Sequence, residues 1–289
     1  MKKGQIYEGI IERVDFPNKG MIYIPEEEKY VTVKNGIPGQ KVRFMINKFK
    51  RGNGEGRLLE VLEKSPLETR EPVCSIFPAC GGCMYQTMSY EEQVKMKEGQ
   101  IHRIMDPVVK GDYIFESVKE SPKEFHYRNK MEFSFGDEYK DGPLALGMHK
   151  RGSFYDIVNV GECQIVDEDF RRVLKITLEY FKEKQIPFYH KLRHTGYLRH
   201  FLVRKAAKTG EILVDLVTTT QMEELSGENE SALLEGWVKK LCEEKYDGVL
   251  KGILHTKNDS VADTIKNEGT DILFGQDFFY EELLGLKFK

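Results

Sequence analysis

The sequence between positions 74 and 83 reads Cys74-Ser75-Ile76-Phe77-Pro78-Ala79-Cys80-Gly81-Gly82-Cys83 and contains three of the five cysteines of the chain. Its proline and paired glycines disfavour both helix and strand, so we expect irregular backbone that can curl around a bound group. A fourth cysteine, Cys163, lies far downstream at the end of an expected strand. This pattern predicts a metal site that joins the loop to the remote strand end.

The spacing of these four cysteines leaves three kinds of site open. Structural zinc is usually held by two close C-x2-4-C pairs, and only Cys80 and Cys83 form such a pair. Iron–sulfur clusters are held by four thiolates with uneven spacing of this kind, and Gly81 and Gly82 would let backbone N–H groups approach the sulfurs. We therefore place an iron–sulfur cluster first, zinc second and unligated thiols third.

Length and composition predict about two domains in a soluble, cytoplasmic protein. The 289 residues, 40% of them hydrophobic, are enough to bury a sizeable core. The formal net charge of -3 excludes a uniformly basic surface but not a local basic face. The N-terminus has no apolar targeting segment, and no run approaches the ~20 apolar residues of a membrane span. We expect a monomer without a membrane partner, in which clustered cysteines bind metal rather than form disulfides.

Residues 1–65 are predicted to form a small closed barrel. Short runs alternate apolar and polar residues and are separated by turn sequences such as Asn35-Gly36, which is typical of about five half-buried strands that close on themselves. A basic loop between positions 41 and 57 contains Glu55 as its one acid and could follow a phosphate backbone. The alternative is a solvated hairpin without a ligand. The candidate RNA contacts here are Arg43, Lys48, Lys50 and Arg51.

Residues 70–289 are predicted to form an α+β domain that carries the cysteine loop. Ser89 begins a capping-box sequence, so a helix with an apolar stripe should follow the loop directly. Asp167 should cap a second helix, and a third, from 228 to 245, places Cys242 in its apolar stripe as a buried structural thiol. Strands are expected over residues 125–135, 144–148, 156–160, 198–207 and 211–219.

Basic residues in the second domain predict further RNA contacts. The segment from 190 to 208 contains lysines, arginines and histidines without one acid, and aromatic residues lie between them. Cations beside aromatic rings suit unpaired RNA, which offers phosphates and bases to stack. The alternative is that these residues form the solvated sides of strands. The candidate contacts are Arg128, Lys130, Arg199 and His200.

Four motifs follow one another along the chain: Cys74-x5-Cys80-Gly81-Gly82-Cys83-x2-Gln86, Tyr127-Arg128-Asn129-Lys130, Gly147-Met148-His149 and Gly161-Glu162-Cys163. In this pattern the chain resembles the RNA uracil-5-methyltransferase family, and most closely the 23S rRNA (uracil-5-)-methyltransferases that carry a [4Fe-4S] cluster. Residues 1–65 resemble the TRAM domain, an OB-like RNA-binding module. The resemblance implies 23S rRNA as the partner and a [4Fe-4S] cluster held by Cys74, Cys80, Cys83 and Cys163.

The resemblance also implies a catalytic domain that we do not find in this sequence. In the family, an S-adenosylmethionine-binding domain with a catalytic cysteine and a glutamate base follows the region that resembles residues 70–289. Here no glycine-rich strand-to-helix turn of the nucleotide-binding kind occurs, and the chain stops at Lys289. We therefore expect no catalytic or S-adenosylmethionine-binding residues before that position, and no activity for this N-terminal portion alone. The alternative function is a non-catalytic iron–sulfur or zinc RNA-binding protein.

Overall fold

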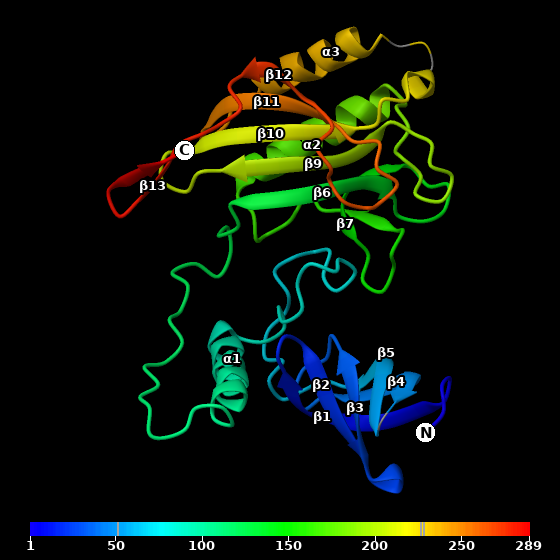
Figure 1. Ribbon diagram of the computed structural model, residues 1–289, viewed down its shortest axis with the longest axis vertical. Helices are drawn as coiled ribbons and strands as arrows, with labels where there is room; N and C mark the ends of the chain where they lie inside the picture. The colour runs from blue at the N-terminus through cyan, green and yellow to red at the C-terminus, as the bar shows by residue number, and fades with distance from the viewer. Residues whose placement is uncertain (51, 226, 228) are drawn as a thin grey trace. The chain divides into compact units, whose positions relative to one another are not determined.

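The computed structural model describes residues 1–50, 52–225, 227 and 229–289, which form two compact units. Unit 1 comprises Met1–Val73 and Cys83–Pro122, and unit 2 comprises Cys74–Gly82 and Lys123–Lys289. Figure 1 shows the elements of each unit along the chain. The observed division differs from the expected one, because the segment after the cysteine loop groups with the barrel instead of the α+β unit.

The barrel of unit 1 is closed, with the strand order β1-β2-β3-β5-β4. Neighbouring strands are antiparallel, except that β3 and β5 are parallel. Alternate residues such as Ile22, Val31 and Phe44 point inward and are fully buried, so the period-two pattern is confirmed. The elements are β1 Ile6–Asp15, β2 Lys19–Ile24, a 3-10 turn Pro25–Glu27, β3 Lys29–Lys34, β4 Lys41–Lys50 and β5 Asn53–Glu63.

Helix α1, Tyr90–Met105, belongs to unit 1 and begins where the capping sequence predicts. The Ser89 side chain accepts a hydrogen bond from the Glu92 N–H at 3.3 Å, which satisfies one of the open donors of the first turn. The expected apolar stripe is wrong, since Ile104 is 50% exposed. The helix contacts the barrel core through Met96, and Gln100 and Arg103 both donate to the carbonyl oxygen of Val14, at 3.1 and 3.0 Å.

Unit 2 contains a seven-stranded sheet in the order β12-β11-β10-β9-β6-β7-β8. Only the pair β10 and β11 is parallel, which requires the crossover that α3 supplies. The first strand begins five residues later than expected, because the backbone N–H groups of His126 and Arg128 donate to the carbonyls of Gln164 and Ile165 instead of a neighbouring strand. The strands are β6 Lys130–Asp137, β7 Leu144–His149, β8 Ile157–Asn159, β9 Leu198–Lys205, β10 Glu211–Thr218, β11 Val249–Lys257 and β12 Thr270–Gly275, followed by the hairpin β13 Glu281–Leu283 and β14 Leu286–Phe288.

Helices α2, Glu168–Glu183, and α3, Glu230–Glu243, pack with the sheet into the core of unit 2 (Figure 1). At its centre, the ring of Trp237 lies 5.9 Å from that of Phe181 and 6.0 Å from that of Phe201. Cys242 is exposed, so its expected burial is wrong. Leu241, four residues after Trp237, takes the core position, and the next residue is rotated away from the core by about 100°.

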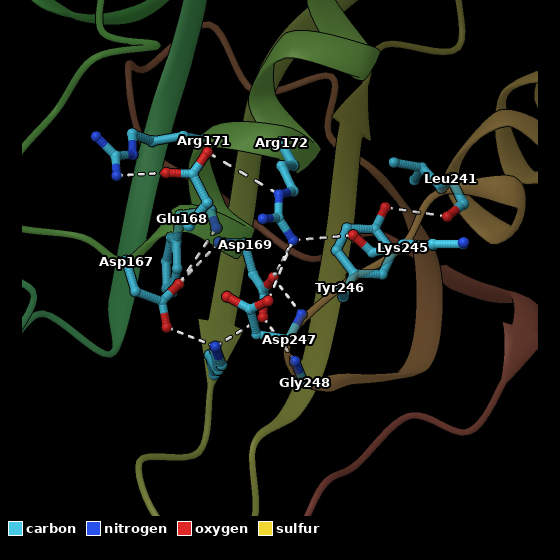
Figure 2. A network of polar contacts seen from close by, with 12 residues as sticks. Asp167, Glu168, Asp169, Arg171, Arg172, Leu241, Lys245, Tyr246, Asp247 and Gly248 are labelled. Carbon is cyan, nitrogen blue, oxygen red and sulfur yellow. Dashed lines mark hydrogen bonds and ion pairs between the residues drawn. The ribbon is translucent and has the colours of Figure 1, made fainter.

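The buried carboxylate of Asp169 links helix α2 to strand β9 and to the residues just before β11 (Figure 2). Asp169, in the first turn of α2, is fully buried and accepts hydrogen bonds from the backbone N–H groups of Asp247 and Gly248 at 2.8 and 2.9 Å. It also accepts from the Lys205 ammonium of β9 at 2.7 Å. Burial alone would raise the pKa of Asp169, but these donors outweigh it and hold the pKa below its usual range. The contact joins α2, β9 and the start of β11.

We expect Asp169→Ala to lower the free energy of unfolding by about 3 to 5 kcal/mol, because it leaves the poorly exposed Lys205 ammonium without a buried partner. Urea denaturation followed by circular dichroism measures this. Asp247→Ala is the matched control: its exposed side chain can be removed while its backbone N–H remains, so a change within about 0.5 kcal/mol is expected. Equal losses in both variants would show that the buried carboxylate has no special role.

Candidate nucleic-acid interface

The part of the cysteine loop that belongs to unit 2 forms a compact turn. The backbone N–H of Phe77 donates to the Cys74 carbonyl at 3.1 Å, and the N–H of Cys80 donates to the Ile76 carbonyl at 3.2 Å. The Gly82 N–H donates to the sulfur of Cys80 at 3.3 Å. The predicted irregular backbone is confirmed, and one glycine N–H approaches a sulfur as expected.

The predicted cysteine ligands are divided between the two units. Cys74 is buried in unit 2, where Cys80 and Cys163 are half-buried and pack against the core, whereas Cys83 begins the second segment of unit 1. Across the described ranges 1–50, 52–225, 227 and 229–289, no group of three or more histidine, cysteine or acidic side chains is arranged to hold a metal ion. The four thiols have the chemistry that an iron–sulfur cluster requires, but a site assembled from them stays a prediction.

The basic loop of the barrel is less cationic than its sequence indicates. Arg43 pairs with Glu8 at 2.8 Å and with Glu60 at 2.7 Å, so acids of the neighbouring strands β1 and β5 neutralise it. Lys48 and Lys50, near the end of β4, are exposed and keep their charges in solvent. The remaining candidate, Arg51, lies outside the described residues. The expectation that Glu55 is the only acid facing this loop is therefore corrected.

Two of the four candidates in unit 2 are exposed. Arg128 lies in the segment before β6, and its Nε donates to the carbonyl of Lys130 at 3.0 Å. Lys130 is the first residue of β6 and is also exposed. Both side chains can therefore reach a phosphate from solvent.

Arg199 and His200 lie beneath the surface, each 4% exposed. The Arg199 guanidinium donates to the carbonyls of Asn258, Ser260 and Ala262 at 2.6 to 2.9 Å and so holds that loop against the sheet. Burial lowers the pKa of His200 to about 4, so its imidazole is neutral at physiological pH. The expectation that these two side chains face RNA is corrected by their burial in this fold.

Residues that the sequence interpretation missed lie in the hairpin between β7 and β8. Phe154 is 61% exposed and Tyr155 is 51% exposed, with their rings edge to face at 5.4 Å. The ammonium of Lys191, from the expected basic segment, lies 5.0 Å from the centre of the Phe154 ring. Two adjacent aromatic residues directly after Gly152-Ser153 are a signal that could have indicated this feature, since a turn normally exposes its side chains.

Comparison with known proteins shows which proteins the chain resembles in sequence. No family model matches it. It is 43% identical over 289 residues to an uncharacterized RNA methyltransferase of Caldanaerobacter subterraneus subsp. tengcongensis, and 44% identical over 289 residues to one of Clostridium tetani. The chain is therefore similar to RNA methyltransferases over its whole length. The motif-based expectation is confirmed at this level, whereas 23S rRNA as the substrate stays a prediction.

The fold of the chain also occurs in a solved structure. Pyrococcus abyssi tRNA (uracil-54, C5)-methyltransferase in complex with S-adenosyl-L-homocysteine superposes with a TM-score of 0.65 over 97% of this chain and 58% of that one, at 20% identity. The mixed fold with a small barrel and a large sheet is therefore shared. The chain spans 62% and 61% of the two curated relatives, and a catalytic domain placed after Lys289 is not supported by these comparisons and stays a prediction. None of the described helices combines the length and the apolar character needed to cross a membrane.

A separate cavity of about 690 Å³ lies on the sheet face opposite the helices. Its walls include Leu202 and Leu254 of the sheet and Phe278 of the C-terminal segment, with Asp215 of β10 among them. One oxygen of Asp215 accepts from the Thr256 hydroxyl at 3.1 Å, while the other is buried and has no hydrogen-bond donor among the residues described. Burial raises the pKa of this carboxyl to about 6.

The raised pKa of Asp215 predicts a pH-dependent loss of stability. A carboxyl whose pKa is higher in the folded state stabilises the fold below its unfolded pKa and loses that contribution as the pH rises to about 6. Asp215→Asn should therefore gain on the order of 2 kcal/mol over the parent chain between pH 4 and pH 7, in urea titrations at each pH. Asp277→Asn, at an exposed carboxyl of the same cavity, is the control and should show no such trend. A difference that is constant with pH would contradict the assignment.

Proposed function

We propose that the chain provides RNA recognition in an S-adenosylmethionine-dependent RNA (uracil-5-)-methyltransferase whose substrate is 23S rRNA. The identity of more than 40% over all 289 residues to RNA methyltransferases is the observation that carries the proposal. The choice of uracil C5 and of 23S rRNA rests on the cysteine motif and the TRAM-like barrel. The methyl-transfer chemistry belongs to the whole protein.

Exposed cations on both units support the RNA-binding part of this proposal. Lys48 and Lys50 extend from the barrel, and in unit 2 the exposed Arg128 and Lys130 lie just before and at the start of β6. Such side chains contribute sequence-independent affinity by neutralising phosphates. Recognition of the target nucleotide then requires groups that contact unpaired bases, because base-specific contacts in RNA are made mainly where the strand is single.

The substrate is tested with the full-length protein, S-adenosylmethionine labelled in its methyl group, and two transcripts, one of 23S rRNA and one of tRNA. We expect label in the rRNA only, recovered as 5-methyluridine after digestion. Label in tRNA alone would overturn the choice of rRNA, and recovery of another methylated nucleoside would overturn the choice of uracil C5. A catalytically silent protein that still binds RNA would favour the non-catalytic alternative.

We further propose that Cys74, Cys80, Cys83 and Cys163 hold a [4Fe-4S] cluster, which would supply a structural cross-link between the loop and the end of β8. Anaerobically purified protein should contain about four iron and four sulfide per chain. Cys163→Ser should lose most of this iron, whereas Cys242→Ser, which removes the exposed thiol of α3, should retain it. One zinc per chain without iron, or iron retained in Cys163→Ser, would contradict the proposal.

A further inference from the structure

The hairpin between β7 and β8, residues 149–157, combines exposed aromatic rings with a fixed position. We propose that Phe154 and Tyr155 of this hairpin stack an unpaired base of the RNA, and that the cysteine loop determines where the hairpin stands. The inference rests on the proposed function and adds to it the residues that receive a base. Neither the cysteine spacing nor the basic segments of the sequence assign this role to the hairpin.

The exposed rings are the first observation. More than half of the surface of both Phe154 and Tyr155 is accessible, although aromatic side chains of this size are normally buried in the core. The two rings meet edge to face, at 85° with their centres 5.4 Å apart. Every nucleobase has a planar π surface, and stacking on an aromatic side chain is the usual way in which proteins bind unpaired bases.

Charge around the rings is the second observation. The Lys191 ammonium lies 5.0 Å from the centre of the Phe154 ring and 2.6 Å from a carboxylate oxygen of Asp263. His149 stacks on Phe154 with ring centres 6.1 Å apart, and burial lowers the pKa of its imidazole, so it adds a ring rather than a charge. The Lys191 ammonium beside the Phe154 ring suits a nucleotide, which brings a phosphate together with its base.

Contacts with the cysteine loop hold the hairpin in place. The Gly81 N–H donates to the carbonyl of His149 at 3.0 Å, and the Arg151 N–H donates to the carbonyl of Ala79 at 2.7 Å. The Arg151 side chain donates from Nε to the Pro78 carbonyl at 2.9 Å. The loop therefore lies along the hairpin like a short added strand, and a shift of either one breaks several hydrogen bonds at once.

The turn itself is fixed from within. The hydroxyl of Ser153 accepts from the backbone N–H groups of Tyr155 and Asp156, at 3.3 and 3.1 Å. Gly152 has a φ of 80°, a left-handed conformation that favours glycine. Phe154 and Tyr155 are thus presented by a rigid turn, and a rigid aromatic platform loses little conformational entropy when a base stacks on it.

The experiment uses the 289-residue chain and a fluorescein-labelled single-stranded RNA, with binding followed by fluorescence anisotropy. Phe154→Ala and Tyr155→Ala should each weaken binding about tenfold, in the range expected for one lost base stack. Tyr139→Ala is the matched control, since Tyr139 is 62% exposed in the β6–β7 turn of the same unit, and it should change binding less than about twofold. Phe154→Trp should restore affinity, and its emission should be quenched by RNA, whereas the buried Trp237 should not respond.

Salt dependence and a double-variant cycle test the role of the cysteine loop in bracing the hairpin, that is, whether Arg151 holds the hairpin in place through its bonds to this loop. Arg151→Ala should weaken binding as well, but it should have little further effect in a chain that already carries Phe154→Ala, since both act on the same stack. Neither variant should reduce the dependence of log Kd on log salt, which falls when a phosphate contact is lost. Additive losses with a reduced slope in Arg151→Ala would mean a direct phosphate contact and would overturn the bracing role.

Failure of this inference is separable from failure of the proposed function. If the parent chain binds RNA and the Phe154 and Tyr155 variants behave like Tyr139→Ala, the stacking site is wrong and RNA recognition stands. If the parent chain binds no RNA at all in low salt, the proposed RNA recognition by this chain fails and the stacking site fails with it.

Discussion

The architecture of unit 2 depends on the buried carboxylate of Asp169. A carboxylate removed from water is stable only where donors replace its hydration, and here two backbone N–H groups and the Lys205 ammonium do so. Because these donors come from the start of β11 and from β9, the first turn of α2 cannot move without breaking contacts in two strands. The position of Asp169 in the first turn adds a favourable interaction with the helix dipole.

Ion pairs between residues distant in sequence explain why the basic segment from 190 to 208 does not form a continuous cationic surface. Lys205 is bound to Asp167 and Asp169, and Lys191 is bound to Asp263, all far away in sequence. A one-dimensional pattern shows which charges are close in the chain but not which charges the sheet brings together. The acid-free run therefore overstated the charge of the surface, just as the loop around Arg43 did in the barrel.

Local chemistry was predictable where it depends on neighbours in the chain. The caps at Ser89 and Asp167 were correct because a side-chain oxygen reaches the N–H groups two or three residues later. The barrel was correct because alternation records which side of a strand is buried. The errors at Ile104 and Cys242 have the opposite origin: a stripe of apolar residues indicates a face, but only the packing partner decides how much of that face is covered.

The cysteine loop shows the limit of reasoning from one motif. Its spacing predicts a role for the sulfurs and for the remote Cys163, whereas its hydrogen bonds in unit 2 join it to the hairpin at His149 and Arg151. The combination of flexible exposed lysines with a fixed aromatic turn has a physical advantage. Long exposed lysines such as Lys48 and Lys50 attract any phosphate backbone but lose much conformational entropy when they are ordered. A turn that is held by hydrogen bonds and exposes two rings is already ordered in the folded protein. It can therefore place a single unpaired base with little further loss of conformational entropy.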